Sequence, residues 1–76
     1  MEDLYQGHLI RFGAALDSKT KHWTPAAMVF WNEGVNFRSV QILFELAFPT
    51  EKQAQRHARE FAMLWINAGK PEVRFS

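Results

Sequence analysis

The three histidines are the first residues to consider for chemistry in this sequence. His8, His22 and His57 stand far apart, without the short spacing that usually joins the ligands of a metal site. His57 and Glu60 form an i, i+3 pair in an expected helix, and such a pair alone gives a metal only weak support. Solvated or half-buried histidines account for the pattern better. We therefore expect no metal and no cofactor.

Nucleophilic and acid–base catalysis have equally little support. The chain has no cysteine, and Ser18 and Ser39 lack the Gly-x-Ser-x-Gly turn of a hydrolase. No spacing brings Asp17 and Glu45 together as a carboxylate pair. The sequence thus predicts a protein that is not an enzyme and has no catalytic residues.

The length allows one small domain, residues 1–76. A domain of this size buries only about 60 to 65% of the surface that its unfolded chain exposes. Disulfides, a metal or a partner subunit usually add stability to such a domain, and the absence of cysteine excludes the first. Eleven aromatic residues, seven Phe, three Trp and one Tyr, exceed what one small core obviously needs.

The absence of cysteine and the start of the chain favour a cytoplasmic protein, and the charge balance bears on nucleic-acid binding. Nine Lys and Arg nearly balance eight Asp and Glu, so the strongly basic character of many nucleic-acid binders is missing. The opening Met1-Glu2-Asp3 is followed by no apolar run, so we expect neither a signal peptide nor a membrane span.

Three strands are expected, at about residues 5–16, 23–31 and 37–48, joined by short polar turns. The third has the clearest alternation, with one apolar face made of Val40, Ile42, Phe44, Leu46 and Phe48. Pro25 cannot donate a ladder hydrogen bond, so it should lie near the start of its strand or on an unpaired edge. Consecutive strands with short connections favour an antiparallel meander.

A helix is expected at about residues 51–68. Thr50 and Gln53 have the spacing of a capping box, and Asn67 or Gly69 can end the helix before Pro71. The tail, residues 70–76, is either a short added strand or disordered. One helix face is apolar, with Ala54, Ala58, Phe61, Ala62, Trp65 and Ala68. The predicted fold class is therefore α+β, a β-β-β-α arrangement: a three-stranded antiparallel meander with one C-terminal helix packed on one face.

A single helix leaves the other face of the sheet without a cover. Whichever way the second strand is turned, that face receives either Ala26, Met28 and Phe30 or Ala27, Val29 and Trp31. Either the tail or the N-terminal segment folds across these residues in a monomer, or the face binds a second copy or a protein partner. The second interpretation gives a non-enzymatic interaction module, possible as a homodimer, with four predicted anchors: Trp23, Val29, Trp31 and Leu43.

Nucleic-acid binding is the alternative function. Lys19 and Lys21 stand in the first turn, and Arg56 and Arg59 lie on the outer face of the expected helix. Phosphate contacts would use these cations. A solvated charged helix face explains Arg56 and Arg59 equally well.

Several short motifs together resemble a group of small bacterial proteins of unknown function. They are Tyr5-x-Gly7-His8, Trp23-x-Pro25, and Phe48-x-Thr50-x-x-x-Ala54 with the later Ala58, Ala62, Trp65 and Ile66, spanning most of residues 5–68. The resemblance implies a small β-β-β-α domain. It implies no catalytic or binding residue.

Overall fold

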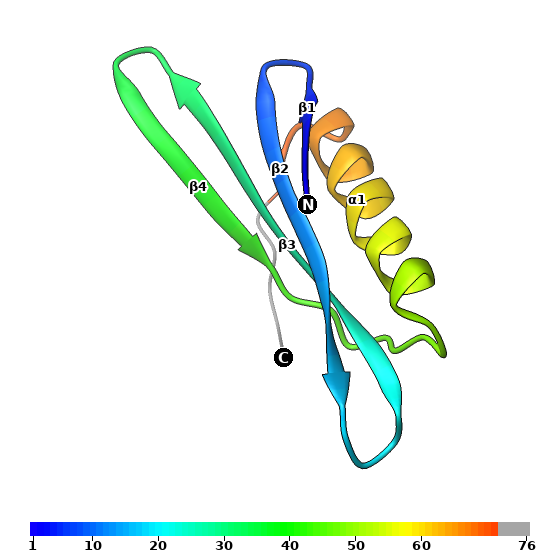
Figure 1. Cartoon of the computed structure of the whole chain (residues 1–76). Helices are drawn as coiled ribbons and strands as arrows, with labels where there is room; N and C mark the ends of the chain where they lie inside the picture. The colour runs from blue at the N-terminus through cyan, green and yellow to red at the C-terminus, as the bar shows by residue number, and fades with distance from the viewer. Residues whose placement is uncertain (72–76) are drawn as a thin grey trace.

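The computed structural model describes residues 1–71. One antiparallel sheet of four strands is followed by one helix (Figure 1). The elements are β1 (Glu2–Tyr5), β2 (His8–Asp17), β3 (His22–Glu33), β4 (Asn36–Ile42) and α1 (Glu51–Asn67). The strands follow one another in the order β1-β2-β3-β4. The predicted α+β class, the meander and the C-terminal helix are confirmed, but the predicted number of three strands is wrong.

The additional strand is β1, which forms a tight hairpin with β2. Tyr5 pairs with His8, so only Gln6 and Gly7 make the turn. Both have positive φ, 49° and 76°, as the favoured two-residue hairpin turns require. Gly7 therefore lies in the turn between two strands. The predicted strand at 5–16 had included Gly7.

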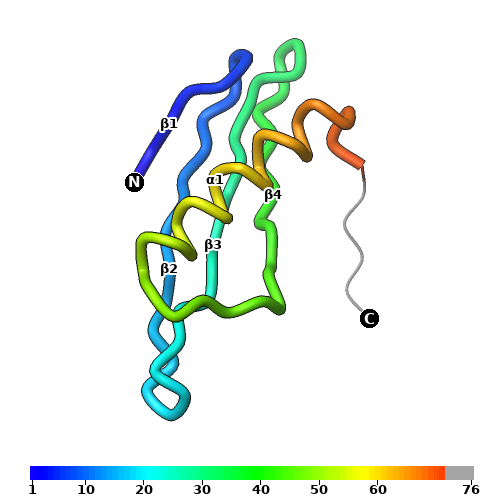
Figure 2. The backbone as a smooth tube through the Cα atoms, turned by 90° about the vertical axis from the view of Figure 1, so that its right-hand side faces the viewer, coloured from blue at the N-terminus to red at the C-terminus, as the bar shows by residue number. Residues whose placement is uncertain are grey.

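The β2–β3 hairpin is the longest feature of the sheet. Its nine cross-strand pairs run from Leu9 with Phe30 to Asp17 with His22. The closed end of this hairpin projects beyond α1 (Figures 1 and 2). Pro25 lies near the start of β3, past the last pair between β3 and β4, Ala27 with Ile42. Pro25 thus occupies a part of β3 that β4 does not pair with, as predicted.

β4 is shorter than the predicted strand at 37–48. It ends at Ile42, and the chain then leaves the ladder to reach the start of α1. Only Phe48 returns to the sheet, in an isolated bridge with Trp23. Phe44 and Phe48 belong to the same apolar alternation, but they pack against the ring of His57 on the helix. The alternation of apolar residues therefore extends beyond the end of the strand.

α1 lies across one face of β2 and β3 and forms the second layer (Figure 2). Ala54, Ala58 and Ala62 are fully buried, so the helix approaches the sheet closely. Phe61 was predicted on the buried face but remains 39% exposed, packed edge-on against Phe44. The other core residues lie on the helix side of the sheet or near the end of α1: Ile10, Ala27, Val29, Ile42, Trp65 and Ile66.

The two ends of α1 follow the predicted signals. The hydroxyl of Thr50 accepts a hydrogen bond from the amide of Gln53 at 3.2 Å, so Thr50 is the N-cap. At the other end Gly69 has φ +87°, and its amide donates to the carbonyl of Ile66. Lys70 and Pro71 follow this turn. The predictions for the rest of the tail, residues 72–76, lie outside the described residues.

Within the described chain, the sheet has two edges of different character. β1 has four residues and carries Glu2 and Asp3, whereas β4 has seven residues and Arg38 as its one charge. Among residues 1–71 we find no helix with both the length and the apolar character needed to cross a membrane.

Candidate interaction surface

Strand alternation divides the sheet into a helix side and an outer face. The register pairs Ile10 with Val29 and Val29 with Val40, and Val29 is fully buried on the helix side. Residues one position along each strand therefore point away from α1. Two apolar cross-strand pairs come together in this way, Leu4 with Leu9 and Leu9 with Phe30.

The centre of the outer face is aromatic. The rings of Phe30 and Phe37 are stacked with their centroids 6.0 Å apart. The guanidinium carbon of Arg11 lies 5.5 Å from the ring centroid of Phe30, and its Nε is 2.5 Å from a carboxylate oxygen of Glu2. Arg11 therefore covers part of an aromatic ring while its charge is balanced by Glu2.

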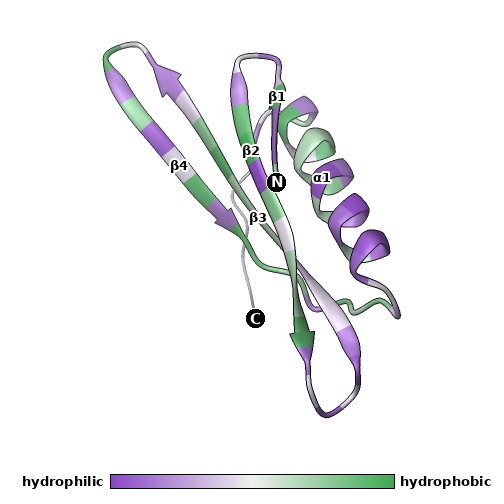
Figure 3. Ribbon diagram, in the orientation of Figure 1, coloured by the Kyte–Doolittle hydropathy of each residue, from purple (hydrophilic) through white to green (hydrophobic). Residues whose placement is uncertain are grey.

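We define the outer apolar patch as Leu4, Leu9, Met28, Phe30 and Phe37. Leu4 is 76% exposed and Phe37 is 67% exposed. A hollow of about 330 Å³ lies where the β1–β2 and β3–β4 hairpins separate, and Leu4, Leu9, Phe30 and Phe37 are among its lining residues. Figure 3 shows that the first half of α1 is mainly polar, whereas apolar segments occur in every long strand. No described element covers the outer apolar patch.

The predicted anchors are divided between different parts of the molecule. Val29 is fully buried and Trp31 packs against Trp65 with ring centroids 6.1 Å apart, so both belong to the helix side. Trp23 is half-buried where β3 bridges to Phe48, and Leu43 is 53% exposed just after β4. The structure does not bring these four residues together. Of the two possible orientations of β3, it shows the one that turns Ala26, Met28 and Phe30 outward.

Sequence reasoning did not include Leu4 and Phe37 among the predicted anchors. Phe37 is the second residue of β4, and it pairs with Asn32, the residue after Trp31. Leu4 alternates with Asp3 and Tyr5, but it precedes the predicted first strand, which began at residue 5. Recognising Gln6-Gly7 as a hairpin turn would have placed Leu4 beside Leu9.

The cations predicted for nucleic-acid binding occupy two regions. Lys19 and Lys21 are exposed at the closed end of the β2–β3 hairpin, and Arg56 is exposed on α1. Arg59 is different, because its Nε donates to a carboxylate oxygen of Asp3 at 2.6 Å in a part-buried position. The charge of Arg59 is thus largely balanced within the molecule.

The histidines lie in three separate environments. His57 packs against the rings of Phe44, Phe48 and Phe61. The Nδ1 atoms of His8 and His22 are each within hydrogen-bond distance of a backbone carbonyl oxygen. Among residues 1–71, no three acidic or histidine side chains gather closely enough to hold a metal ion.

Comparisons of the chain with protein-family models, with curated proteins and with solved structures find no match, so the argument about function rests on the geometry above.

Proposed function

We propose that this protein is a non-enzymatic interaction module that self-associates through the outer face of its sheet. The outer apolar patch carries the proposal, because it joins Leu4, Leu9, Phe30 and Phe37 on a surface that no described element covers. Contiguous exposed apolar surface is uncommon on monomers and usually marks an interface.

The small core supports a second copy as the partner. Four of the nine buried hydrophobic residues are alanines, and the only large side chains that are fully buried are Ile10, Ile42 and Val29 among the described residues. The free energy gained by burying so small a core exceeds the conformational entropy cost of folding by only a little. Burying the outer apolar patch against a second copy would add the apolar contact area that the core lacks.

The dimensions of the sheet predict a weak and reversible association. Four strands at a spacing of about 4.8 Å, each contributing about seven residues at about 3.3 Å, give a face of roughly 450 Å². That is below the approximately 800 Å² per partner of a standard stable interface. We therefore expect a concentration-dependent monomer–dimer equilibrium. A two-fold arrangement would place the same patch on both sides of the interface.

Sedimentation velocity over a range of concentrations tests the proposal. The unmodified protein should sediment faster as its concentration rises, whereas Phe37→Asp should remain monomeric because it places a charge at the patch of both copies. Val35→Asp is the matched control, since Val35 is fully exposed in the β3–β4 turn and lies outside the patch.

Circular dichroism should show that both variants keep the fold. A wild-type protein that stays monomeric into the millimolar range would overturn the proposal. A Phe37→Asp variant that dimerises as the wild type does would overturn it equally.

A nucleic-acid-binding function is the second candidate, and the projecting β2–β3 hairpin is the observation that favours it. Two-stranded ribbons are used to read DNA grooves, and this one presents exposed Lys19 and Lys21 at its closed end. Binding through these cations must weaken steeply with salt. A gel shift that is absent at low salt, or that survives Lys19→Gln with Lys21→Gln, would exclude this use of the hairpin.

A further inference from the structure

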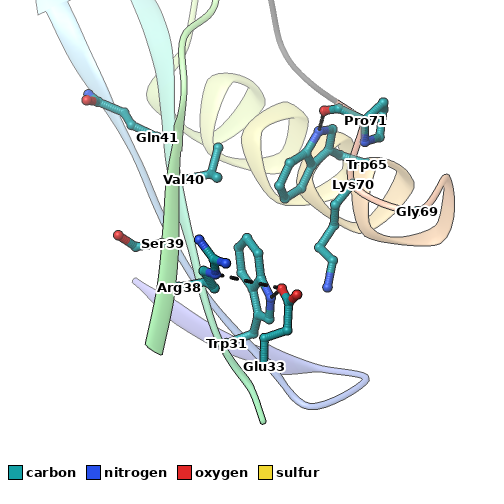
Figure 4. Close-up of a pocket in the computed structure, with 10 residues that line it drawn as sticks. All are labelled: Trp31, Glu33, Arg38, Ser39, Val40, Gln41, Trp65, Gly69, Lys70 and Pro71. Carbon is teal, nitrogen blue, oxygen red and sulfur yellow. Dashed lines mark hydrogen bonds and ion pairs between the residues drawn. The ribbon is translucent and has the colours of Figure 1, made fainter. Parts of the chain in front are cut away.

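A second hollow, of about 520 Å³, lies beside the open edge of β4 and next to the turn that follows α1. Figure 4 shows two indole rings, Trp31 from β3 and Trp65 from α1, together with Lys70 on one side and Arg38 on β4. Its volume is within the range of small-molecule sites. We refer to it as the edge pocket.

The two indoles form fixed apolar walls. Trp31 and Trp65 meet edge to face at an interplanar angle of 65°. The indole N–H of Trp65 donates to the carbonyl of Pro71 at 2.8 Å, which ties the chain after α1 to the pocket wall. Val40 adds an aliphatic side chain from β4. A flat apolar group can therefore lie against these walls without a polar atom of theirs losing a partner.

Lys70 holds its ammonium group at this pocket. Its Nζ lies 4.4 Å from the ring centroid of Trp31 and 3.0 Å from Nε2 of His8. Nδ1 of His8 is 2.7 Å from the carbonyl oxygen of Gln6, which can only accept, so Nδ1 carries the proton and donates. Nε2 is then the acceptor for Lys70. An ammonium group has three donors, and this contact uses one.

Two tight turns bring these contacts together. Gln6 and Lys70 have φ of 49° and 56°, in the left-handed region that non-glycine residues rarely adopt. Both belong to the contact chain Gln6–His8–Lys70. Gln6 takes this conformation as part of the two-residue β1–β2 turn, and Lys70 takes it directly after the turn at Gly69. The Lys70 ammonium is thus held in place by contacts from the β1–β2 turn.

Arg38 lines the pocket on the opposite side of the Trp31 indole from Lys70 (Figure 4). Its Nε is 3.8 Å from a carboxylate oxygen of Glu33, and its side chain is 55% exposed, so this ion pair is loose. No carboxylate of the described residues lies within ion-pair distance of Lys70. The edge pocket therefore combines two cations, one carboxylate and two aromatic walls.

We propose that the edge pocket binds a small carboxylate with a flat apolar body. The carboxylate faces Lys70, and the body lies against Trp31 and Trp65. The edge pocket shares Trp31 with the hollow at the outer apolar patch, but none of the five residues that define the patch lines it. Ligand binding at the edge pocket and self-association through the outer apolar patch can therefore be tested independently of each other.

Titration of the full chain with naphthalene-2-carboxylate tests the site, with naphthalene-2-carboxamide as the neutral counterpart. Two-dimensional ¹H–¹⁵N spectra report the indole N–H signals of the three tryptophans. The acid should shift the signals of Trp31 and Trp65, whereas Trp23, which lies beside Phe48 at the other end of β3, should not move. The amide should bind at least about tenfold more weakly, because it makes no charge-assisted contact.

Lys70→Met keeps the aliphatic stem and removes the charge, so it should weaken binding of the acid by about tenfold or more. Lys52→Met, in the exposed first turn of α1, is the matched control and should bind as the wild type does. Equal affinity for acid and amide in the wild type would overturn the proposal even where Lys70→Met fails to fold. Absence of any shift at millimolar acid, or equal movement of Trp23, would overturn it as well.

Discussion

Small residues on α1 determine how the core is built. Ala54, Ala58 and Ala62 have no exposed surface, and together they let the helix backbone lie close to β2 and β3. Large side chains meet the sheet only near the end of the helix, where Trp65 and Ile66 are buried. The packing energy is therefore concentrated in few side chains, and Trp65 contributes the largest of them on the helix.

Replacing Trp65 with alanine should lower the free energy of unfolding by about 3 to 5 kcal/mol, because it removes the largest buried ring and leaves a cavity. Leu64→Ala is the control, since Leu64 is 66% exposed on the adjacent position, and it should change stability little. Urea unfolding followed by circular dichroism measures both. A Trp65→Ala protein as stable as Leu64→Ala would show that the indole does not support the core.

At the scale of elements, the first strand is held from two sides. β1 pairs with β2 and also contacts α1, where Asp3 accepts from Arg59 at 2.6 Å and the hydroxyl of Tyr5 donates to Asn67 at 2.9 Å. A strand of four residues has few ladder hydrogen bonds of its own. Its position over α1 therefore depends on these side-chain contacts.

Asp3→Asn should destabilise the protein by up to about 1 kcal/mol, because the ion pair with Arg59 is partly screened by solvent. Amide exchange in β1 should accelerate more than exchange in β3, since local opening is sufficient to release this strand. Glu2→Gln removes the ion pair with Arg11, which is more exposed than the pair of Asp3 with Arg59, and should have a smaller effect. Uniform acceleration in β1 and β3 would contradict a local role for Asp3.

The same elements show what a single sequence can predict. The cap at Thr50, the alanine face of α1 and the stop at Gly69 depend on residues close together in the chain, and all three were predictable. The orientation of β3 was not, because Ala27, Val29 and Trp31 are as apolar as Ala26, Met28 and Phe30. Only the register with β2, which pairs Ile10 with Val29, decides which set is buried.

The edge pocket was beyond sequence reasoning for a related reason. Lys70 and His8 lie 62 positions apart, and their contact depends on two left-handed backbone turns. Neither Gln6 nor Lys70 is a residue type that indicates such a turn. The fold class therefore followed from local pattern, whereas both candidate sites depend on long-range packing.

The whole molecule consists of two layers, a sheet and one helix, and the buried face of that helix is mostly alanine. Its small core leaves room for association to increase the free energy of unfolding. If two copies bury the outer apolar patch, dimerisation stabilises the folded state by mass action. The midpoint of thermal unfolding should then rise with protein concentration, whereas that of Phe37→Asp should not. A midpoint that is independent of concentration in both proteins would argue against coupling between folding and association.

The unequal sheet edges limit how far copies can assemble. β4 offers seven residues for pairing, whereas β1 offers four and places Glu2 and Asp3 there. Growth of a continuous sheet into a fibre requires each copy to add a neighbour at both edges. Growth beyond two copies paired through β4 would have to use the β1 edges, which offer only four residues each. We therefore expect a sheet that is continued through β4 to stop at two copies rather than to grow into a fibre.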